Sequence, residues 1–173
     1  TDARSTRLFQ AYFRGVPSER IVAQPPQQTV DGDVVTVSMP LLLELPDLAV
    51  SALPDDFEPG DTPPEYLGST PTLPVGHLDI QNAARSIIEG AEHRLDAVRR
   101  INDWVFAEVA KEPSVGVPNG LEVLYSKRGD CNEHTALFVS LARAAGIPTR
   151  IAAGVVFSER VGPKGQFYYH AWP

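Results

Sequence analysis

The chain has 173 residues, of which 43% are hydrophobic and 21% are charged, a composition typical of one compact soluble domain with a smaller attached piece. Its 22 acidic and 15 basic residues give a formal net charge of -7, and no Lys/Arg stripe with interleaved aromatics occurs, so nucleic acid is not expected as a partner. No run approaches the roughly 18 apolar residues of a membrane span. A single cysteine allows no internal disulfide and indicates no compartment.

The first 64 residues are expected to form a mostly β segment followed by a connector. Strands are predicted over residues 8–13 and 34–39, the second after an Asp31-Gly32 turn signal. Too few strands are visible to close a sheet alone. The prolines concentrated in residues 40–74 predict an irregular connector, and we therefore expect two domains, residues 1–64 and 65–173.

From residue 79 onwards the apolar spacing becomes helical. Helices are predicted over residues 79–91 and 95–111, the second with an apolar stripe of Leu95, Val98, Ile101, Val105 and Val109. Pro113 ends that helix, and residues 114–121 are expected to form a loop.

A third helix, residues 131–145, is apolar nearly all round and should be buried centrally. Gly146 suits its left-handed C-terminal cap, and Pro148 prevents continuation. Residues 150–158 and 166–172 then predict an antiparallel hairpin around a turn at residues 162–165.

The chain's only cysteine, Cys131, falls at the first position of this third helix. Asp130 is the predicted N-cap, and Glu133 can reach back to the N–H of Asp130 in a capping box. The unpaired N–H groups and the helix dipole favour a thiolate at Cys131, although Asp130 opposes this effect. The alternative is a cysteine that only packs in the core, which is common for a lone cysteine on an apolar helix.

His170 is the best candidate for a base beside Cys131. Alternation along residues 166–172 places Tyr168, His170 and Trp172 on one face, and the hairpin can return that strand to the start of the third helix. Trp172 could then shield His170 from water. The backbone N–H of Cys131 could donate to an oxyanion.

His134 lies three residues after Cys131 and therefore on nearly the same side of the helix. We expect it to support the site through hydrogen bonds. The alternative, a zinc site of Cys131, His134 and His170, has too few thiolates for a typical structural zinc. No metal and no cofactor are therefore expected, and His77 and His93 are expected to be surface or cap residues.

The segments GDCNEHTALFVSLARAAGIPTRIAAGVV and FYYHAWP resemble the bacterial transglutaminase-like domain of the papain-like cysteine-enzyme superfamily. The resemblance implies an α+β fold, with Cys131 as nucleophile at the N-terminus of a central helix packed on an antiparallel sheet, and with His170 as base. It also implies an orienting Asp on the next strand. Because the sequence stops at Pro173, we expect a C-terminally truncated core with little or no activity, since loss of the orienting carboxylate costs about four orders of magnitude in serine enzymes. A sheet edge left exposed could also mediate self-association.

The implied reaction is acyl transfer from a protein or peptide amide through a thioester at Cys131. Water as acceptor gives a protease or deamidase, and an amine gives a transglutaminase; the resemblance to bacterial members favours hydrolysis. A noncatalytic binding module of the same fold, or a zinc-stabilised module, is the alternative function.

Overall fold

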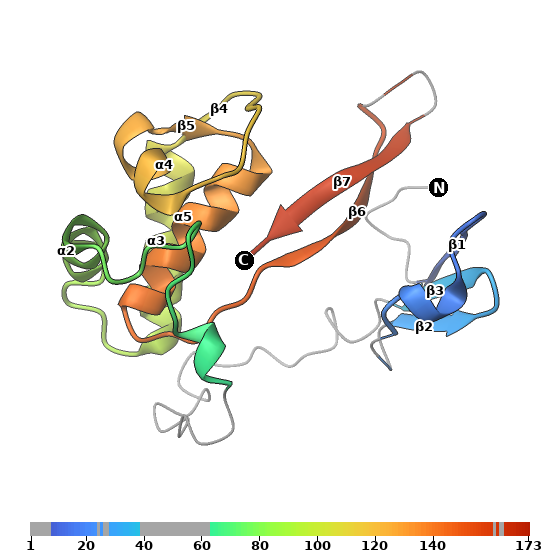
Figure 1. Ribbon diagram of the computed structural model, residues 1–173, viewed down its shortest axis with the longest axis horizontal. Coiled ribbons are helices and arrows are strands. Elements are labelled where there is room, and N and C mark those ends of the chain that lie inside the picture. Colours follow the sequence, from blue (N-terminus) through green and yellow to red (C-terminus); the bar gives the residue numbers. More distant parts are fainter. Residues whose placement is uncertain (1–7, 24, 26–27, 39–62, 161, 163–164) are drawn as a thin grey trace. The chain divides into compact units, whose positions relative to one another are not determined.

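The computed structural model describes residues 8–23, 25, 28–38, 63–160, 162 and 165–173. The chain forms two compact units, Thr1–Leu53 and Pro54–Pro173. The boundary predicted between residues 64 and 65 stays a prediction, and the predicted connector lies outside the described residues as far as residue 62. Helices and antiparallel strands occur together, which confirms the α+β class (Figure 1).

The first unit contains a three-stranded antiparallel sheet in the order β1-β3-β2. The elements are β1 (Leu8–Tyr12), the 3-10 turn η2 (Ser18–Arg20), β2 (Gln28–Asp31) and β3 (Val34–Ser38). Gly32, with φ at +57°, makes the turn between β2 and β3, as the Asp31-Gly32 signal predicted. The sequence prediction missed β2, because a strand of four residues is too short for alternation to identify.

The second unit is mostly helical before its final hairpin. It contains η5 (Pro64–Tyr66), α2 (Leu78–Ile87), α3 (Arg94–Glu108), α4 (Gly120–Ser126) and α5 (Cys131–Ala144). His77 and His93 are N-caps, since the side chain of His77 accepts from the N–H of Asp79 and that of His93 from the N–H of Asp96.

The loop predicted over residues 114–121 is wrong at its end, because α4 begins at Gly120. Asn119 caps this helix by accepting from the N–H groups of Leu121 and Glu122. The helix has only 7 residues, so its stability depends on packing against α5 more than on local propensity.

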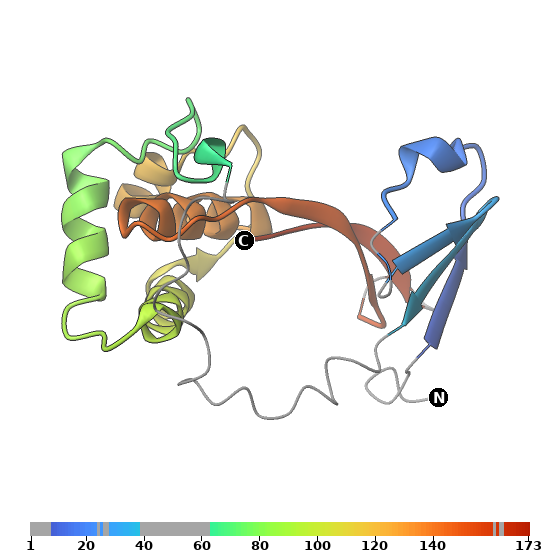
Figure 2. The ribbon, with the colours of Figure 1, turned by 90° about the horizontal axis from the view of Figure 1, so that it is seen from below.

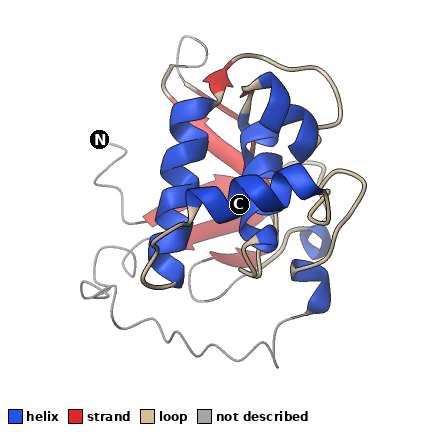
Figure 3. Ribbon diagram, turned by 90° about the vertical axis from the view of Figure 1, so that its left-hand side faces the viewer, coloured by secondary structure: helices blue, strands red, loops and turns tan. Residues whose placement is uncertain are grey.

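Helix α5 is the centre of the hydrophobic core, and α2, α3 and α4 pack against it. Its side chains are buried on all sides, with Leu137, Val139 and Leu141 fully inaccessible. The helices pack together on the side of the unit away from the hairpin (Figures 2 and 3). Gly146, with φ at +78°, ends α5 in the predicted left-handed cap.

The predicted hairpin consists of β6 (Ala152–Ser158) and β7 (Gln166–Trp172), which pair antiparallel with Gly154 opposite His170. Strand β7 packs against α5. The pair runs out from the helices as the orange and red strands of Figure 1. None of the helices described here has the length and apolar character needed to cross a membrane.

A short parallel bridge fixes where α5 begins. Strand β4 (Ala110–Lys111) directly follows α3, and β5 (Arg128–Gly129) directly precedes Asp130. The N–H of Ala110 donates to the carbonyl of Lys127 over 2.8 Å, and that of Glu112 donates to Gly129 over 3.0 Å. These bonds join the C-terminal end of α3 to the N-terminus of α5.

Candidate functional site

The start of α5 carries the predicted capping box. The carboxylate of Asp130 accepts from the N–H of Asn132 over 2.8 Å, and Oε2 of Glu133 accepts from the N–H of Asp130 over 2.9 Å. Glu133 is only 7% exposed, so its carboxylate serves to accept the hydrogen bond at the helix start. The box fixes the backbone on both sides of Cys131, which occupies the first helical position.

Cys131 lines a cleft of about 700 Å³ with three walls. The first wall is one face of α5, where Cys131, His134 and Phe138 follow at helical spacing. The second wall is residues 168–173 of β7 and beyond, and the third is the last two turns of α3 with residues 111–113. We call this the Cys131 cleft.

His170 lines the same cleft from β7, so helix and strand bring together the two residues that the sequence singled out. The rings of Tyr168 and Trp172 flank it edge-to-face, with centroids 6.1 Å and 4.7 Å from that of His170. This confirms the predicted alternation. Gly154, opposite His170, leaves room for Trp172, because a Cβ there would lie 3.4 Å from the indole ring.

Nδ1 of His170 is the one buried side-chain nitrogen or oxygen of the described residues that makes no hydrogen bond. A buried polar atom without a partner costs roughly 1–3 kcal/mol. This nitrogen is the position at which a carboxylate orients the imidazole in a Cys-His-Asp arrangement.

The ring of His134 lies between two backbone carbonyls. Its Nδ1 is 2.7 Å from the carbonyl oxygen of Asp130, and its Nε2 is 3.1 Å from that of Val109. The ring therefore connects the end of α3 to the start of α5. A metal ion could bind His134 only by displacing one of these contacts, and no three His, Cys, Asp or Glu side chains within the described ranges are grouped to hold one.

Lys127 stabilises the same frame from the other side of the bridge. It adopts a left-handed conformation with φ at +55°, and its Nζ lies 3.7 Å from the ring centroid of Trp104 and 3.8 Å from a carboxylate oxygen of Glu108. Burial lowers the pKa of Lys127, against the opposing effect of Glu108. Trp104 packs against the hydrophobic core as well as against Lys127.

Tyr125, whose hydroxyl could in principle contact a bound carbonyl, is engaged elsewhere. It donates to the carboxylate of Asp79 on α2, and this bond raises the pKa of Tyr125.

Phe106 and Lys111 also line the cleft, from the third wall, but were not among the predicted site residues. In the sequence, Phe106 stands out only as an aromatic residue that lies off the apolar stripe of its helix.

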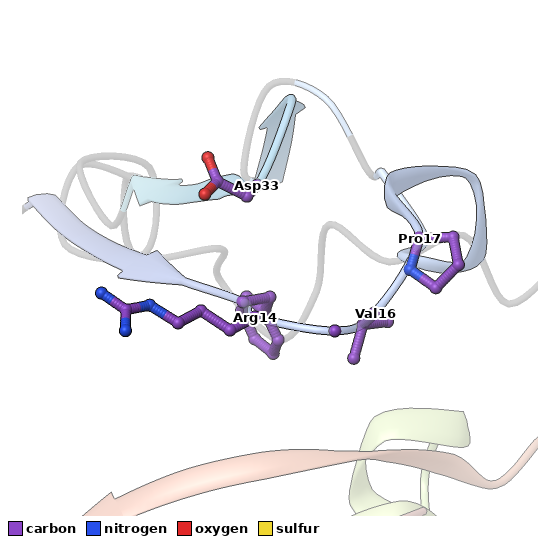
Figure 4. A pocket seen from close by; sticks show the side chains of 6 residues that line it. Arg14, Val16, Pro17 and Asp33 are labelled. Atoms are coloured by element: carbon purple, nitrogen blue, oxygen red, sulfur yellow. The ribbon is translucent and has the colours of Figure 1, made fainter.

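A second, open hollow of about 520 Å³ lies in the first unit. The loop residues Arg14, Val16 and Pro17 form one side and Asp33 the other (Figure 4). No buried polar group of the described residues faces it, and it brings together none of the predicted site residues.

Comparisons with known proteins identify the family and the fold. The family model of the transglutaminase-like superfamily matches residues 81–173, more than half of the chain. No curated protein matches the sequence. Among solved structures, a "putative cysteine protease" from Cytophaga hutchinsonii superposes with a TM-score of 0.52 at 19% identity, over 80% of this chain and 46% of that one.

A "putative protease" from Parabacteroides distasonis superposes with a TM-score of 0.42 at 16% identity, over 78% of this chain and 25% of that one. The chain thus spans less than half the length of either neighbour. The first likeness concerns the fold, whereas the family match covers both Cys131 and His170. The chain belongs to the transglutaminase-like superfamily.

Proposed function

We propose that the Cys131 cleft carries out acyl transfer from a peptide or side-chain amide. Sγ of Cys131 attacks the amide carbonyl while His170 takes the thiol proton and then donates it to the departing amine. The C–N bond breaks and a thioester forms. Water or a second amine then attacks the thioester, His170 accepts its proton, and the thiol is released.

The observation that carries the proposal is the meeting of Cys131 and His170 in one cleft from two separate elements. Cys131 lies at the first helical position, where the backbone N–H has no acceptor within the helix and the dipole favours negative charge. A thiolate and a developing oxyanion would both benefit from this position.

The surroundings of His170 also support a base at this position. Tyr168 and Trp172 flank its ring and limit the approach of water, and the unpartnered Nδ1 is available to an orienting carboxylate. Asp130, Glu133 and His134 act in this proposal as positioning residues, because their hydrogen bonds fix the helix start and its distance from α3.

Hydrolysis and amine transfer share the acylation step and differ only in the acceptor. We propose water as the main acceptor, in line with the resemblance to bacterial transglutaminase-like domains. Protease and deamidase activities then differ only in whether the departing amine is a peptide or ammonia.

The test is single-turnover acylation followed by intact mass. The chain is mixed with an activated p-nitrophenyl ester of N-acetylphenylalanine, quenched in acid and digested to locate the adduct. We expect an acyl group on Cys131, no adduct in Cys131→Ser, and decay of the adduct in water that glycinamide accelerates little. Cys131 that stays unmodified while the ester is consumed elsewhere would contradict the proposal and favour a noncatalytic binding module.

A further inference from the structure

Phe106 is an aromatic residue that the core does not use. The buried positions of α3 are Ala97, Ile101 and Val105, and Phe106 lies off this stripe with 67% of its surface exposed. The exposed part of a large apolar side chain adds no hydrophobic stabilisation and leaves apolar surface in water. Its exposed surface faces the Cys131 cleft, which it lines.

The apolar surface of Phe106 is continued by other cleft residues. Tyr168 and Trp172, which flank His170 on β7, line the cleft and are 40% and 38% exposed, whereas Val105 and Phe138 form its buried floor. Two elements, α3 and β7, therefore present exposed aromatic surface to one hollow that also contains Cys131. Such a hollow, mostly apolar with a few polar groups, is the usual form of a site that holds a substrate side chain.

Lys111 keeps the Phe106 ring in place. Its Nζ lies 4.3 Å from the ring centroid, a distance at which the ammonium is attracted to the face of the ring. Lys111 belongs to β4, which the bridge to β5 holds next to the start of α5. The orientation of Phe106 is thus coupled to the backbone that carries Cys131.

We propose that Phe106 is a specificity-determining residue, and that the cleft selects acyl donors with a large apolar side chain, aromatic ones above all, next to the reacting carbonyl. This inference rests on the proposed function, because it takes Cys131 as the attacking group. A donor with alanine at that position leaves the exposed surface of Phe106, Tyr168 and Trp172 in water. One methylene in an apolar pocket changes discrimination by roughly 10–200-fold, so we expect phenylalanine to be favoured over alanine by at least about tenfold.

The test uses two irreversible probes, the chloromethyl ketones of N-acetylphenylalanine and N-acetylalanine. Each loses chloride when Sγ of Cys131 forms a bond to its methylene carbon, so labelling requires a reactive thiol and no amide turnover. The ratio of their second-order labelling rates, mapped to Cys131 by peptide mass, reports the selectivity. Iodoacetamide, which has no side chain, reports thiol reactivity in each variant.

We expect the phenylalanine probe to label at least about tenfold faster than the alanine probe, and Phe106→Ala to bring the ratio close to one. Phe106→Leu, which keeps apolar bulk, should retain most of it. Leu78→Ala is the matched control, because Leu78 is as exposed as Phe106 but does not line the cleft, and it should leave the ratio unchanged.

Equal labelling by the two probes in the parent chain, or a ratio that Phe106→Ala leaves unchanged, would overturn the inference. Such a result is distinct from failure of the proposed function, in which Cys131 forms no acyl adduct with the ester. If the phenylalanine probe is preferred but no acyl adduct forms, the inference about specificity stands and the proposed acyl transfer is refuted.

Discussion

Replacement of Gly129 by alanine should disrupt the helix start that carries Cys131. Gly129 has φ at +155°, and a Cβ there would lie 2.2 Å from Cβ and 2.5 Å from Cγ of Glu133. A side chain at this φ costs about 1–3 kcal/mol, and displacing Glu133 from the N–H of Asp130 removes a cap that is worth about 0.5–2 kcal/mol. We therefore expect a loss of about 3 kcal/mol in the free energy of unfolding.

The assay is urea unfolding followed by tryptophan fluorescence, because Trp104 and Trp172 both belong to the second unit. The matched control is Gly76→Ala, since a Cβ at Gly76 would meet only Oγ of Ser69, at 3.8 Å. In the double variant Gly129→Ala/Glu133→Gly the collision is absent, because glycine has no Cβ at position 133, so its loss should be smaller than the sum of the two single losses. If Gly129→Ala were as mild as Gly76→Ala, the proposed link between this glycine and the capping box would be refuted.

Three further predictions concern the frame around the site. Arg143→Met should cost roughly 1–3 kcal/mol in urea unfolding, because the guanidinium donates to two part-buried backbone carbonyls of other segments that would lose this donor. Arg143→Lys should recover part of this loss, and equal losses in the two variants would contradict the geometry. Gly120→Ala should cost about 1–3 kcal/mol by overpacking, since its Cβ would lie 2.2 Å from Oγ of Ser140. The bond to Asp79 raises the pKa of Tyr125. This bond therefore stabilises the fold below about pH 10, and its contribution is lost as the pH rises through the higher pKa of the folded state. Tyr125→Phe should lack this alkaline loss of stability, and a pH profile of stability equal to that of the parent chain would refute the prediction.

Local sequence signals predicted the parts of the fold that local interactions determine. The capping box needs only Asp130 and Glu133, three residues apart, and the end of α5 needs only Gly146. The alternation of residues 166–172 likewise predicted from the sequence that His170 and Trp172 lie on one face of β7, and their rings are in contact.

The parts that sequence reasoning missed depend on contacts between distant residues. Helix α4 is too short to show a period, and the β4–β5 bridge has two residues on each side. The second carbonyl beside His134 belongs to Val109, which lies 25 positions away. The cleft wall at Phe106 exists only because the bridge joins α3 to α5, and no local pattern encodes that contact.

In the proposed mechanism His170 serves as the base for Cys131. The direct measurement is the second-order rate of acylation of Cys131 by the p-nitrophenyl ester in the parent chain and in His170→Asn, with His77→Asn as the matched control because Asn also caps a helix. We predict that His170→Asn slows acylation by about 10²–10⁴-fold, the usual contribution of a general base, while His77→Asn leaves the rate unchanged. Acylation of the His170→Asn variant at the parent rate would contradict the claim.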